Sequence, residues 1–218
     1  MIVKICGIKK IEDAITAIDA GAELLGFNFY PQSSRYITPK DCAQIIAALK
    51  DGGKEAIHVG VFVNETSDNV SSIIEQCNLD LVQLCGKESK EEMSTLGQLA
   101  FKAVGPKSIP EGDALMRRFA RQNAPTILVD AYKKGAYGGT GEIGDWAIAR
   151  HLARQAPILL AGGLNPENVS EAVAAVNPWG VDVASGVESS PGVKDASKIF
   201  AFIKAAKSGK EKEVTDVR

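Results

Sequence analysis

The sequence predicts an α/β protein in which eight parallel strands, each followed by a helix, close into a single barrel. Three observations predict this fold class. Eight short apolar or β-branched runs recur along the chain, stretches with helical periodicity separate them, and several runs place polar residues on one side only. A chain of 218 residues is long enough for one such (β/α)8, or TIM, barrel, and no domain linker is evident.

The predicted strands are rich in valine, isoleucine and leucine, and each is separated from the next by enough chain for one helix. They cover residues 2–6, 23–30, 56–63, 79–85, 99–104, 126–130, 158–161 and 181–184.

The predicted helices carry recognisable start and stop signals. The first has an apolar face and ends at Gly21, the second opens with Thr38 followed by Pro39, and the seventh opens with Asn165 and Pro166. The apolar face of the first helix consists of Ile11, Ala14, Ile15 and Ile18. Further helices are expected over 67–77, 88–96, 110–122, 145–154 and 194–207.

Strands joined by helices run parallel, because each crossover returns the chain to the same end of the sheet. Closure into a barrel leaves no bare edge, whereas an open doubly wound sheet, the alternative topology, leaves two. We assign residues 1–206 to the barrel and expect 207–218 to be a charged, frayed C-terminal tail.

The composition excludes several classes of protein. Hydrophobic residues make up 45% of the chain and the net charge is -2, so neither nucleic acid nor an anionic membrane is an expected partner. The chain has no signal-peptide pattern and no apolar run near the ~18 residues of a membrane helix, so a cytoplasmic protein is expected. Four scattered cysteines and two histidines predict no metal site.

Along each barrel strand, side chains point alternately into the barrel and toward the surrounding helices. In strands 2–6 and 181–184, valine and isoleucine suit the helix layer, which leaves Lys4, Cys6 and Asp182 facing inward. We expect Lys4 and Asp182 to form a partly buried ion pair where the barrel closes; Asp182 alternatively contacts substrate hydroxyls. An ammonium beside Cys6 favours its thiolate, a possible base or nucleophile, although an isolated cysteine is more often a buried apolar residue.

Asp130 ends the sixth predicted strand and is a candidate acid opposite Cys6, or alternatively a cap for the following loop. The loops that begin with Gly162-Gly163 and Ser185-Gly186 follow the last two strands, where barrel enzymes commonly bind phosphate through backbone N–H groups. Two tight turns are the simpler reading of these glycines.

Two further loops are candidates. Arg35 in the loop after the second strand could hold a carboxylate through two hydrogen bonds, although loop arginines are usually just solvated. The glycine-rich segment 132–144 is either a lid over the substrate or a flexible connection.

The segment Lys4-Ile-Cys6-Gly7-Ile8 resembles the start of the phosphoribosylanthranilate isomerases of tryptophan biosynthesis. The resemblance extends over nearly the whole chain: GFNFYPQSSRYITP (26–39), HVGVFVN (58–64), LDLVQLCG (79–86), FKAVG (101–105), ILVDA (127–131), YGGTG (137–141) with Asp145-Trp146, AGGLNPENV (161–169) and VDVASGVESSPGVKD (181–195). It implies a (β/α)8 barrel and the Amadori rearrangement of N-(5-phosphoribosyl)anthranilate to an aminodeoxyribulose phosphate.

The resemblance also implies residue roles. Cys6 would be the general base that takes the proton from C2 of the ribose, and Asp130 the general acid that protonates the ring oxygen. Arg35 would bind the anthranilate carboxylate. The substrate phosphate would lie on backbone amides around Gly163, Ser185 and Gly186. No cofactor is implied; the expected partner is the small-molecule phosphosugar, and the expected state is a monomer or homodimer.

One position departs from the family pattern, which often has histidine where this chain has Cys85. A thiol is a poor hydrogen-bond donor, so substrate binding could be altered there, while the acid and the base remain. Three other readings stay open: a ribulose-phosphate epimerase, an indole-glycerol-phosphate-synthase-like enzyme, and a non-catalytic barrel that binds a phosphorylated ligand. The first needs metal-binding histidines and paired aspartates, and the second needs several catalytic lysines and glutamates at strand ends.

Overall fold

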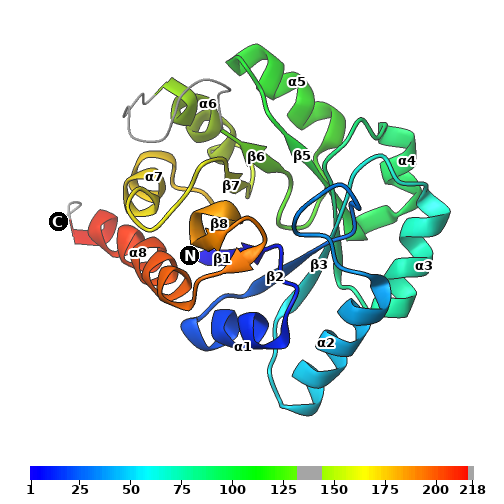
Figure 1. Ribbon diagram of the computed structural model, residues 1–218. Helices are drawn as coiled ribbons and strands as arrows, with labels where there is room; N and C mark the ends of the chain where they lie inside the picture. The colour runs from blue at the N-terminus through cyan, green and yellow to red at the C-terminus, as the bar shows by residue number, and fades with distance from the viewer. Residues whose placement is uncertain (132–143, 216–218) are drawn as a thin grey trace.

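The computed structural model describes residues 1–131 and 144–215 and shows a closed barrel of eight parallel strands in the order in which they occur along the chain. Figure 1 looks into the barrel with the helices arranged around it. The strands are β1 (Ile2–Cys6), β2 (Leu24–Asn28), β3 (Ile57–Phe62), β4 (Leu81–Leu84), β5 (Ala100–Val104), β6 (Leu128–Asp130), β7 (Leu159–Ala161) and β8 (Gly180–Val183). The predicted barrel is confirmed, and the open doubly wound sheet is excluded.

Each strand divides its side chains between two apolar layers. Residues such as Val3, Ile127 and Val181 point outward and pack in one large cluster with the helices. Inward residues form a second, smaller cluster inside the barrel, whose buried members are Leu24, Val59, Phe101, Leu128, Leu159 and Ala161. The expected alternation is therefore confirmed, and the polar inward residues lie in the same interior as this smaller cluster.

The helices cover the outside of the barrel (Figure 1). They are α1 (Ile11–Ala20), α2 (Pro39–Asp51), α3 (Ser67–Cys77), α4 (Lys90–Thr95), α5 (Ile109–Phe119), α6 (Gly144–Ala153), α7 (Val169–Val176) and α8 (Ala196–Thr215). The start and stop signals of the first two helices act as predicted. Gly21 follows α1 in a left-handed conformation with φ 102°, and the Thr38 hydroxyl accepts a hydrogen bond from the Asp41 N–H at the start of α2.

The start of the seventh helix was predicted wrongly. The Asn165 side chain accepts hydrogen bonds from the N–H groups of Glu167 and Asn168, both at 3.0 Å, which makes a local turn in place of a helix cap. The helix α7 therefore begins only after Asn168. Within the described residues, no helix is long and apolar enough to cross a membrane.

The last helix extends past the predicted domain boundary. The helix α8 continues to Thr215, and Lys207, which we expected to begin a frayed tail, donates hydrogen bonds to the Gly21 carbonyl at 2.6 Å and to the Glu23 carboxylate at 2.9 Å. The backbone of 207–215 is thus helical, a correction to the expected tail, while 216–218 lie outside the described residues.

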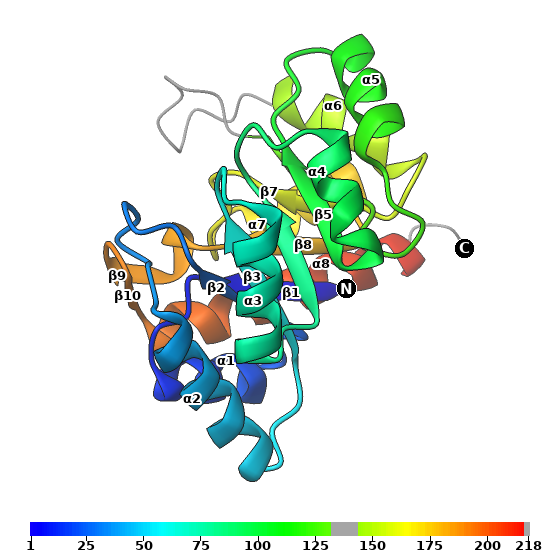
Figure 2. The same ribbon diagram turned by 90° about the vertical axis from the view of Figure 1, so that its right-hand side faces the viewer.

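A small antiparallel hairpin precedes α8 and was not predicted. It consists of β9 (Glu188–Ser190) and β10 (Val193–Lys194) and follows a short 3-10 helix, Ser185–Val187. In Figure 2 it lies on the left of the molecule, away from the N-terminus and beside the loop after β2. This is the side on which the strands end, so the hairpin contributes to the mouth of the barrel.

Candidate active site

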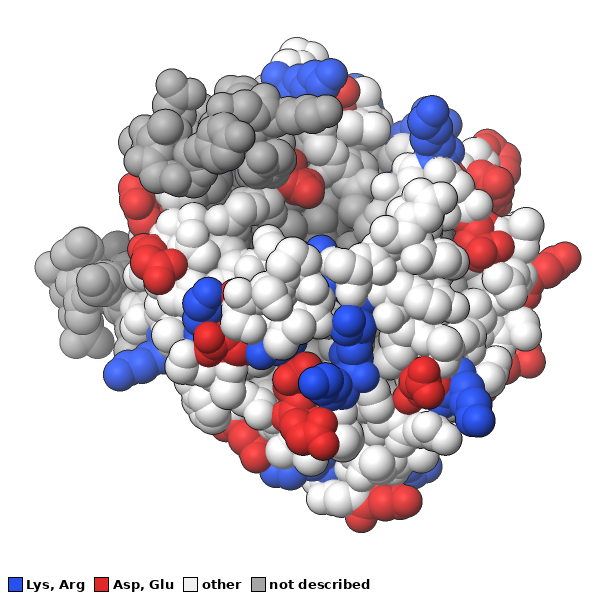
Figure 3. Space-filling model, viewed as in Figure 1, with Lys and Arg blue, Asp and Glu red and all other residues white. Residues whose placement is uncertain are grey.

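The carboxyl ends of the strands surround two adjoining hollows, of about 410 and 360 Å³, which share Asp130, Ala161 and Asp182. Figure 3, viewed as in Figure 1, shows this face hollowed near its centre, with basic and acidic side chains around the hollow. The larger hollow is also lined by Gly162, Gly163, Leu164, Val183, Ala184 and Ser185, and the smaller by Gln83, Cys85, Ala103, Val104, Gly105 and Leu128. Polar side chains from β4, β6 and β8 or the loops that follow them therefore meet in one concave site, as expected for a barrel enzyme.

A buried ion pair lies at the base of the mouth. The Lys4 Nζ is 2.8 Å from Asp182 Oδ1, the Lys4 residue is 0% exposed, and the two residues are register partners on β1 and β8. This confirms the predicted pair. Burial lowers the pKa of Lys4, but the Asp182 carboxylate and the nearby Cys6 outweigh that effect, so the pKa is raised overall and the ammonium stays charged.

Cys6 is also buried, and its electrostatics differ from our expectation. The dominant effect is burial, which raises the pKa of the thiol; Lys4 and Lys194 lower it, and Asp182 raises it. The net direction is upward, so the prediction that Lys4 makes Cys6 easier to ionise than a free thiol is wrong. The sequence shows the neighbouring ammonium but not the loss of water around the sulfur.

The expected acid lines the larger hollow together with residues that we expected to bind the substrate phosphate. Asp130 ends β6 as an exposed residue at its rim, beside the glycine loop after β7, where Gly162 and Gly163 have φ values of 99° and 66°. A Cβ on Gly186 would lie 1.9 Å from the Leu164 carbonyl oxygen, so the loops after β7 and β8 touch there, and glycine is required. Gly163 and Ser185 line the hollow itself, whereas Gly186 serves the contact between the loops.

Arg35 lies beside the mouth and has a partner that the sequence analysis missed. Its Nε and Nη2 donate to the two carboxylate oxygens of Glu188, at 2.8 and 2.7 Å. A Cβ on Gly7 would lie 2.7 Å from Arg35 Cδ, so the arginine stem crosses the residue that follows Cys6. The solvated reading of Arg35 is therefore wrong, since its side chain is only 23% exposed.

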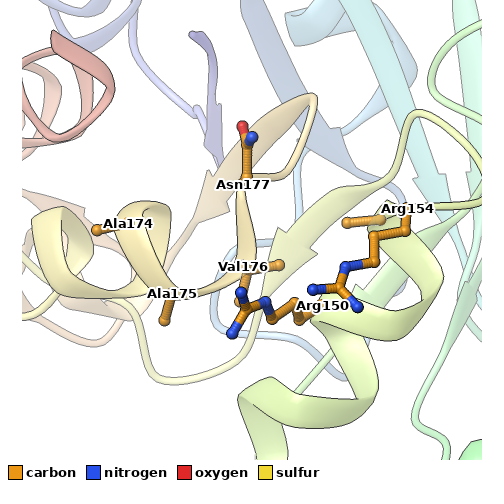
Figure 4. A pocket seen from close by; sticks show the side chains of 7 residues that line it. Arg150, Arg154, Ala174, Ala175, Val176 and Asn177 are labelled. Carbon is orange, nitrogen blue, oxygen red and sulfur yellow. The ribbon is translucent and has the colours of Figure 1, made fainter. Parts of the chain in front are cut away.

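A second hollow lies elsewhere on the surface. It is lined by Arg150, Arg154 and Asn177 together with alanine and valine side chains of α6 and α7. Figure 4 shows the two arginine side chains at this hollow, between two outer helices. Neither Cys6 nor Asp130 lines it, so it is separate from the candidate active site.

Comparison with known proteins identifies the family to which this chain belongs. A family model described as N-(5'phosphoribosyl)anthranilate (PRA) isomerase matches residues 3–205. The chain belongs to the PRA isomerase family. A relative of that name from Geotalea uraniireducens is 47% identical over 206 residues, covering 94% of this chain and 98% of the relative. One from Roseiflexus castenholzii is 46% identical over 213 residues, covering 95% and 99%.

Solved structures of PRA isomerases have the same fold. The crystal structure of the Thermotoga maritima enzyme superposes with a TM-score of 0.83 and 40% identity, covering 95% of this chain and 100% of that one. Another PRA isomerase structure, 37% identical with a TM-score of 0.81 over 95% and 100% of the two chains, contains reduced 1-(o-carboxyphenylamino)-1-deoxyribulose 5-phosphate. The predictions of this family, of the barrel fold and of an isomerase of tryptophan biosynthesis are confirmed.

At the position where the family pattern often has histidine, Cys85 accepts a hydrogen bond from Gln83 Nε2 at 3.1 Å. Gln83 Oε1 in turn accepts from Lys4 Nζ at 2.9 Å. A polar chain thus runs from Asp182 through Lys4 and Gln83 to Cys85. The sequence analysis missed Gln83, although its place between Val82 and Leu84 on β4 indicates an inward side chain.

The expected lid, 132–144, falls almost wholly on residues 132–143, which lie outside the described residues; residue 144 begins α6.

Proposed function

We propose that this chain converts N-(5-phosphoribosyl)anthranilate to 1-(2-carboxyphenylamino)-1-deoxyribulose 5-phosphate with Cys6 as general base and Asp130 as general acid. The observation that carries this assignment is the arrangement at the mouth: Asp130 and Asp182 line one hollow, and Asp182 forms an ion pair with Lys4, which lies two residues before Cys6 on β1. We therefore assign the acid to the end of β6 and the base to the end of β1 of the same barrel.

The chemistry follows from these two groups. Protonation of the ring oxygen by Asp130 opens the furanose and leaves an iminium at C1. The iminium accepts electrons, so the C2 proton becomes acidic and transfers to the Cys6 sulfur, which leaves an enolamine. The enolamine takes up a proton at C1 and loses the proton of its C2 hydroxyl, which gives the ketone. Because the iminium carries positive charge, its formation beside the buried sulfur favours the thiolate, which burial alone disfavours.

Binding is assigned to groups away from the reacting carbons. The substrate phosphate lies on backbone N–H groups near Gly163, Ser185 and Gly186, and Arg35 binds the anthranilate carboxylate. Asp182, fixed by Lys4, accepts a hydrogen bond from a sugar hydroxyl. Binding energy from both ends of the substrate orients the ribose between acid and base.

A steady-state assay with phosphoribosylanthranilate generated in situ, followed by the loss of its fluorescence, tests the assignment. Cys6→Ser removes the base but little volume, so turnover falls by about 10³-fold or more while reduced 1-(o-carboxyphenylamino)-1-deoxyribulose 5-phosphate binds as before. Asp130→Asn is expected to lose turnover to a similar degree.

Near-native turnover in Cys6→Ser would remove Cys6 from the mechanism, and an unaffected Asp130→Asn would dismiss the acid. If the folded wild-type protein binds the reduced compound but converts no substrate, the non-catalytic reading of the barrel gains support. Cys85→Ser is the matched control, because it alters the other thiol of the mouth and retains Cys6 and Asp130.

We also infer that the protein acts in the cytoplasm on a small phosphosugar, without nucleic acid or membrane, as a monomer or homodimer. The net charge of -2 supports the first part. Light scattering of the purified chain decides between the two oligomeric states.

A further inference from the structure

Glu188, at the start of the β9–β10 hairpin, has a full set of partners and no role in the chemistry above. Its side chain is 4% exposed. Oε1 accepts from Arg35 Nε at 2.8 Å and from Lys194 Nζ at 3.0 Å, and Oε2 accepts from Arg35 Nη2 at 2.7 Å and from the Gly192 N–H at 3.2 Å. Burial raises the pKa of Glu188, but the bonds from Arg35 and Lys194 outweigh it and hold the pKa below its ordinary value. The carboxylate is therefore charged and fixed.

The way in which Glu188 holds Arg35 leaves one edge of the guanidinium available. A guanidinium has two edges that can each grip a carboxylate: one made by Nε and one Nη, the other by the two Nη groups. Glu188 occupies the first edge. Within the described residues Arg35 Nη1 makes no hydrogen bond, so the second edge can still bind a carboxylate ligand in the same paired manner.

The position of Arg35 is fixed along its length as well as at its end. Its stem crosses Gly7, directly after Cys6, and the hairpin presses against the same loop: a Cβ on Gly192 would lie 2.3 Å from the Ser34 carbonyl oxygen. Both glycines therefore allow close approaches that a larger residue would prevent. The guanidinium is thus clamped beside the mouth, between the loop after β1 and the hairpin.

The same carboxylate connects Arg35 to the loop assigned to the phosphate. Lys194 Nζ, in a side chain that is 1% exposed, donates to Glu188 at 3.0 Å and to the Ala184 carbonyl at 2.9 Å. Ala184 directly precedes Ser185 and Gly186. A continuous path of charged hydrogen bonds therefore runs from Arg35 through Glu188 and Lys194 to the start of this loop.

We propose that Glu188 is a positioning residue for substrate recognition. It holds Arg35 so that the free guanidinium edge meets the carboxylate of the anthranilate ring, and through Lys194 it fixes the spacing between that contact and the phosphate loop. The inference rests on the proposed binding of the substrate carboxylate by Arg35. It assigns no proton transfer to Glu188, which makes no contact with the reacting carbons in this scheme.

Calorimetric binding of two ligands tests the proposal without depending on turnover. One ligand is reduced 1-(o-carboxyphenylamino)-1-deoxyribulose 5-phosphate, and the other is the same compound without the carboxyl group. In Glu188→Gln, a neutral amide replaces the double carboxylate contact, and the Kd of the carboxylated ligand rises by about tenfold. The Kd of the ligand without the carboxyl group stays within about twofold.

A double-mutant comparison separates positioning from a general structural effect. In an Arg35→Lys background, Glu188→Gln should cause no further loss for the carboxylated ligand, because the arginine through which it acts is gone. Glu188→Asp, which keeps the charge, should restore part of the affinity, and it replaces Glu188→Gln if that variant does not fold. In the isomerase assay, KM should rise while kcat changes little.

Two results would overturn the proposal, and they are distinguishable. If Glu188→Gln lowers the affinity for both ligands equally, and this loss adds to that of Arg35→Lys in the double variant, Glu188 is a structural residue only. Equal affinity of the Arg35→Lys variant and the wild type for the carboxylated ligand would remove the carboxylate role of Arg35, and the positioning role of Glu188 with it. The roles of Cys6 and Asp130 would be unaffected by either result.

Discussion

At the scale of single residues, the charge states of Lys4 and Cys6 depend on the balance between burial, which disfavours charge, and the charged groups nearby. Lys4 and Cys6 are adjacent inward residues of one strand, yet the buried ammonium keeps its charge because Asp182 lies 2.8 Å away. For the buried thiol, Lys4 and Lys194 lower the pKa by less than burial raises it, so the net direction of its pKa is upward. The difference between the two residues therefore comes from their partners and not from their depth in the barrel.

The raised pKa of Cys6 predicts an unusual pH profile. If the Cys6 thiolate is the base and protonated Asp130 is the acid, kcat/KM follows the product of these two fractions, so its pH profile is a bell, one limb of which reports the raised pKa of Cys6. Lys4, whose pKa is also raised, remains charged across this range. The pH dependence of kcat/KM between pH 6 and about 10 measures this.

Cys85 provides the control for that profile, because burial raises the pKa of its thiol to about 11. Cys85→Ser should keep the same bell. A profile with no limb above the ordinary thiol value of about 8.5 would show that the pKa of Cys6 is not raised in the free enzyme or that another group is the base.

At the scale of elements, the ends of β3, β4 and β5 are connected by another buried ion pair, between Lys102 and Glu88. Lys102 on β5 donates to the Leu84 carbonyl at 3.2 Å, the Gly86 carbonyl at 2.7 Å and the Glu88 carboxylate at 2.8 Å. Glu88 also accepts from the Asn64 N–H at 2.7 Å, so it connects the loops after β3 and β4. This clamp supports the loop that carries Cys85.

Breaking the clamp should destabilise the protein. Glu88→Gln leaves the Lys102 ammonium buried without its counter-charge and is expected to lower the free energy of unfolding by about 3 kcal/mol. Burial raises the pKa of Glu88, but Lys102 and the Asn64 N–H outweigh it and lower the pKa overall. The stabilisation is therefore present above the unfolded pKa of ~4.3 and is lost as the pH falls. The difference in the free energy of unfolding between wild type and Glu88→Gln should therefore become smaller in acid.

Urea unfolding at neutral pH measures the change, with Asp19→Asn as the control. Asp19 pairs with Lys54 at the surface, where the side chains are 45% and 34% exposed, and such pairs contribute about 0–1 kcal/mol. Equal effects of the two substitutions would show that the Lys102–Glu88 pair contributes no more than a surface pair.

The same elements show what the sequence could predict. Strand positions and the inward or outward direction of Val3, Lys4 and Ile127 follow from a pattern that repeats every two residues, so local sequence is sufficient. The pair Lys4–Asp182 also followed, because barrel closure makes the first and last strands neighbours. The partners of Arg35 and Lys102 did not follow, since long side chains reach across loops whose relative positions only the folded chain defines.

At the scale of the whole molecule, α8 completes the outer layer by packing against α7 and α1. Its inner face carries Phe202, which is 0% exposed, together with Ile199 and Ile203. On the same helix Phe200 is 50% exposed. The ends of the chain are thus joined through helix packing as well as through the pairing of β1 with β8.

The two phenylalanines of α8 make a matched test of this packing. Phe202→Ala leaves a cavity between three helices and should lower the free energy of unfolding by about 3–5 kcal/mol. Phe200→Ala removes the same side chain from the surface and should change it by about 0.5 kcal/mol or less. Thermal or urea unfolding of the two variants measures both, and equal effects would show that α8 does not hold the layer closed.

The ion pair between Lys4 and Asp182 joins residues that are 178 positions apart in the chain. During synthesis on the ribosome, Lys4 therefore has no counter-charge from Asp182 until β8 has been made. An ammonium without its partner is better solvated by water than by a barrel interior, so a nascent half-barrel is discouraged from collapsing around β1. The pair thus couples the closing of the barrel to the synthesis of its last strand.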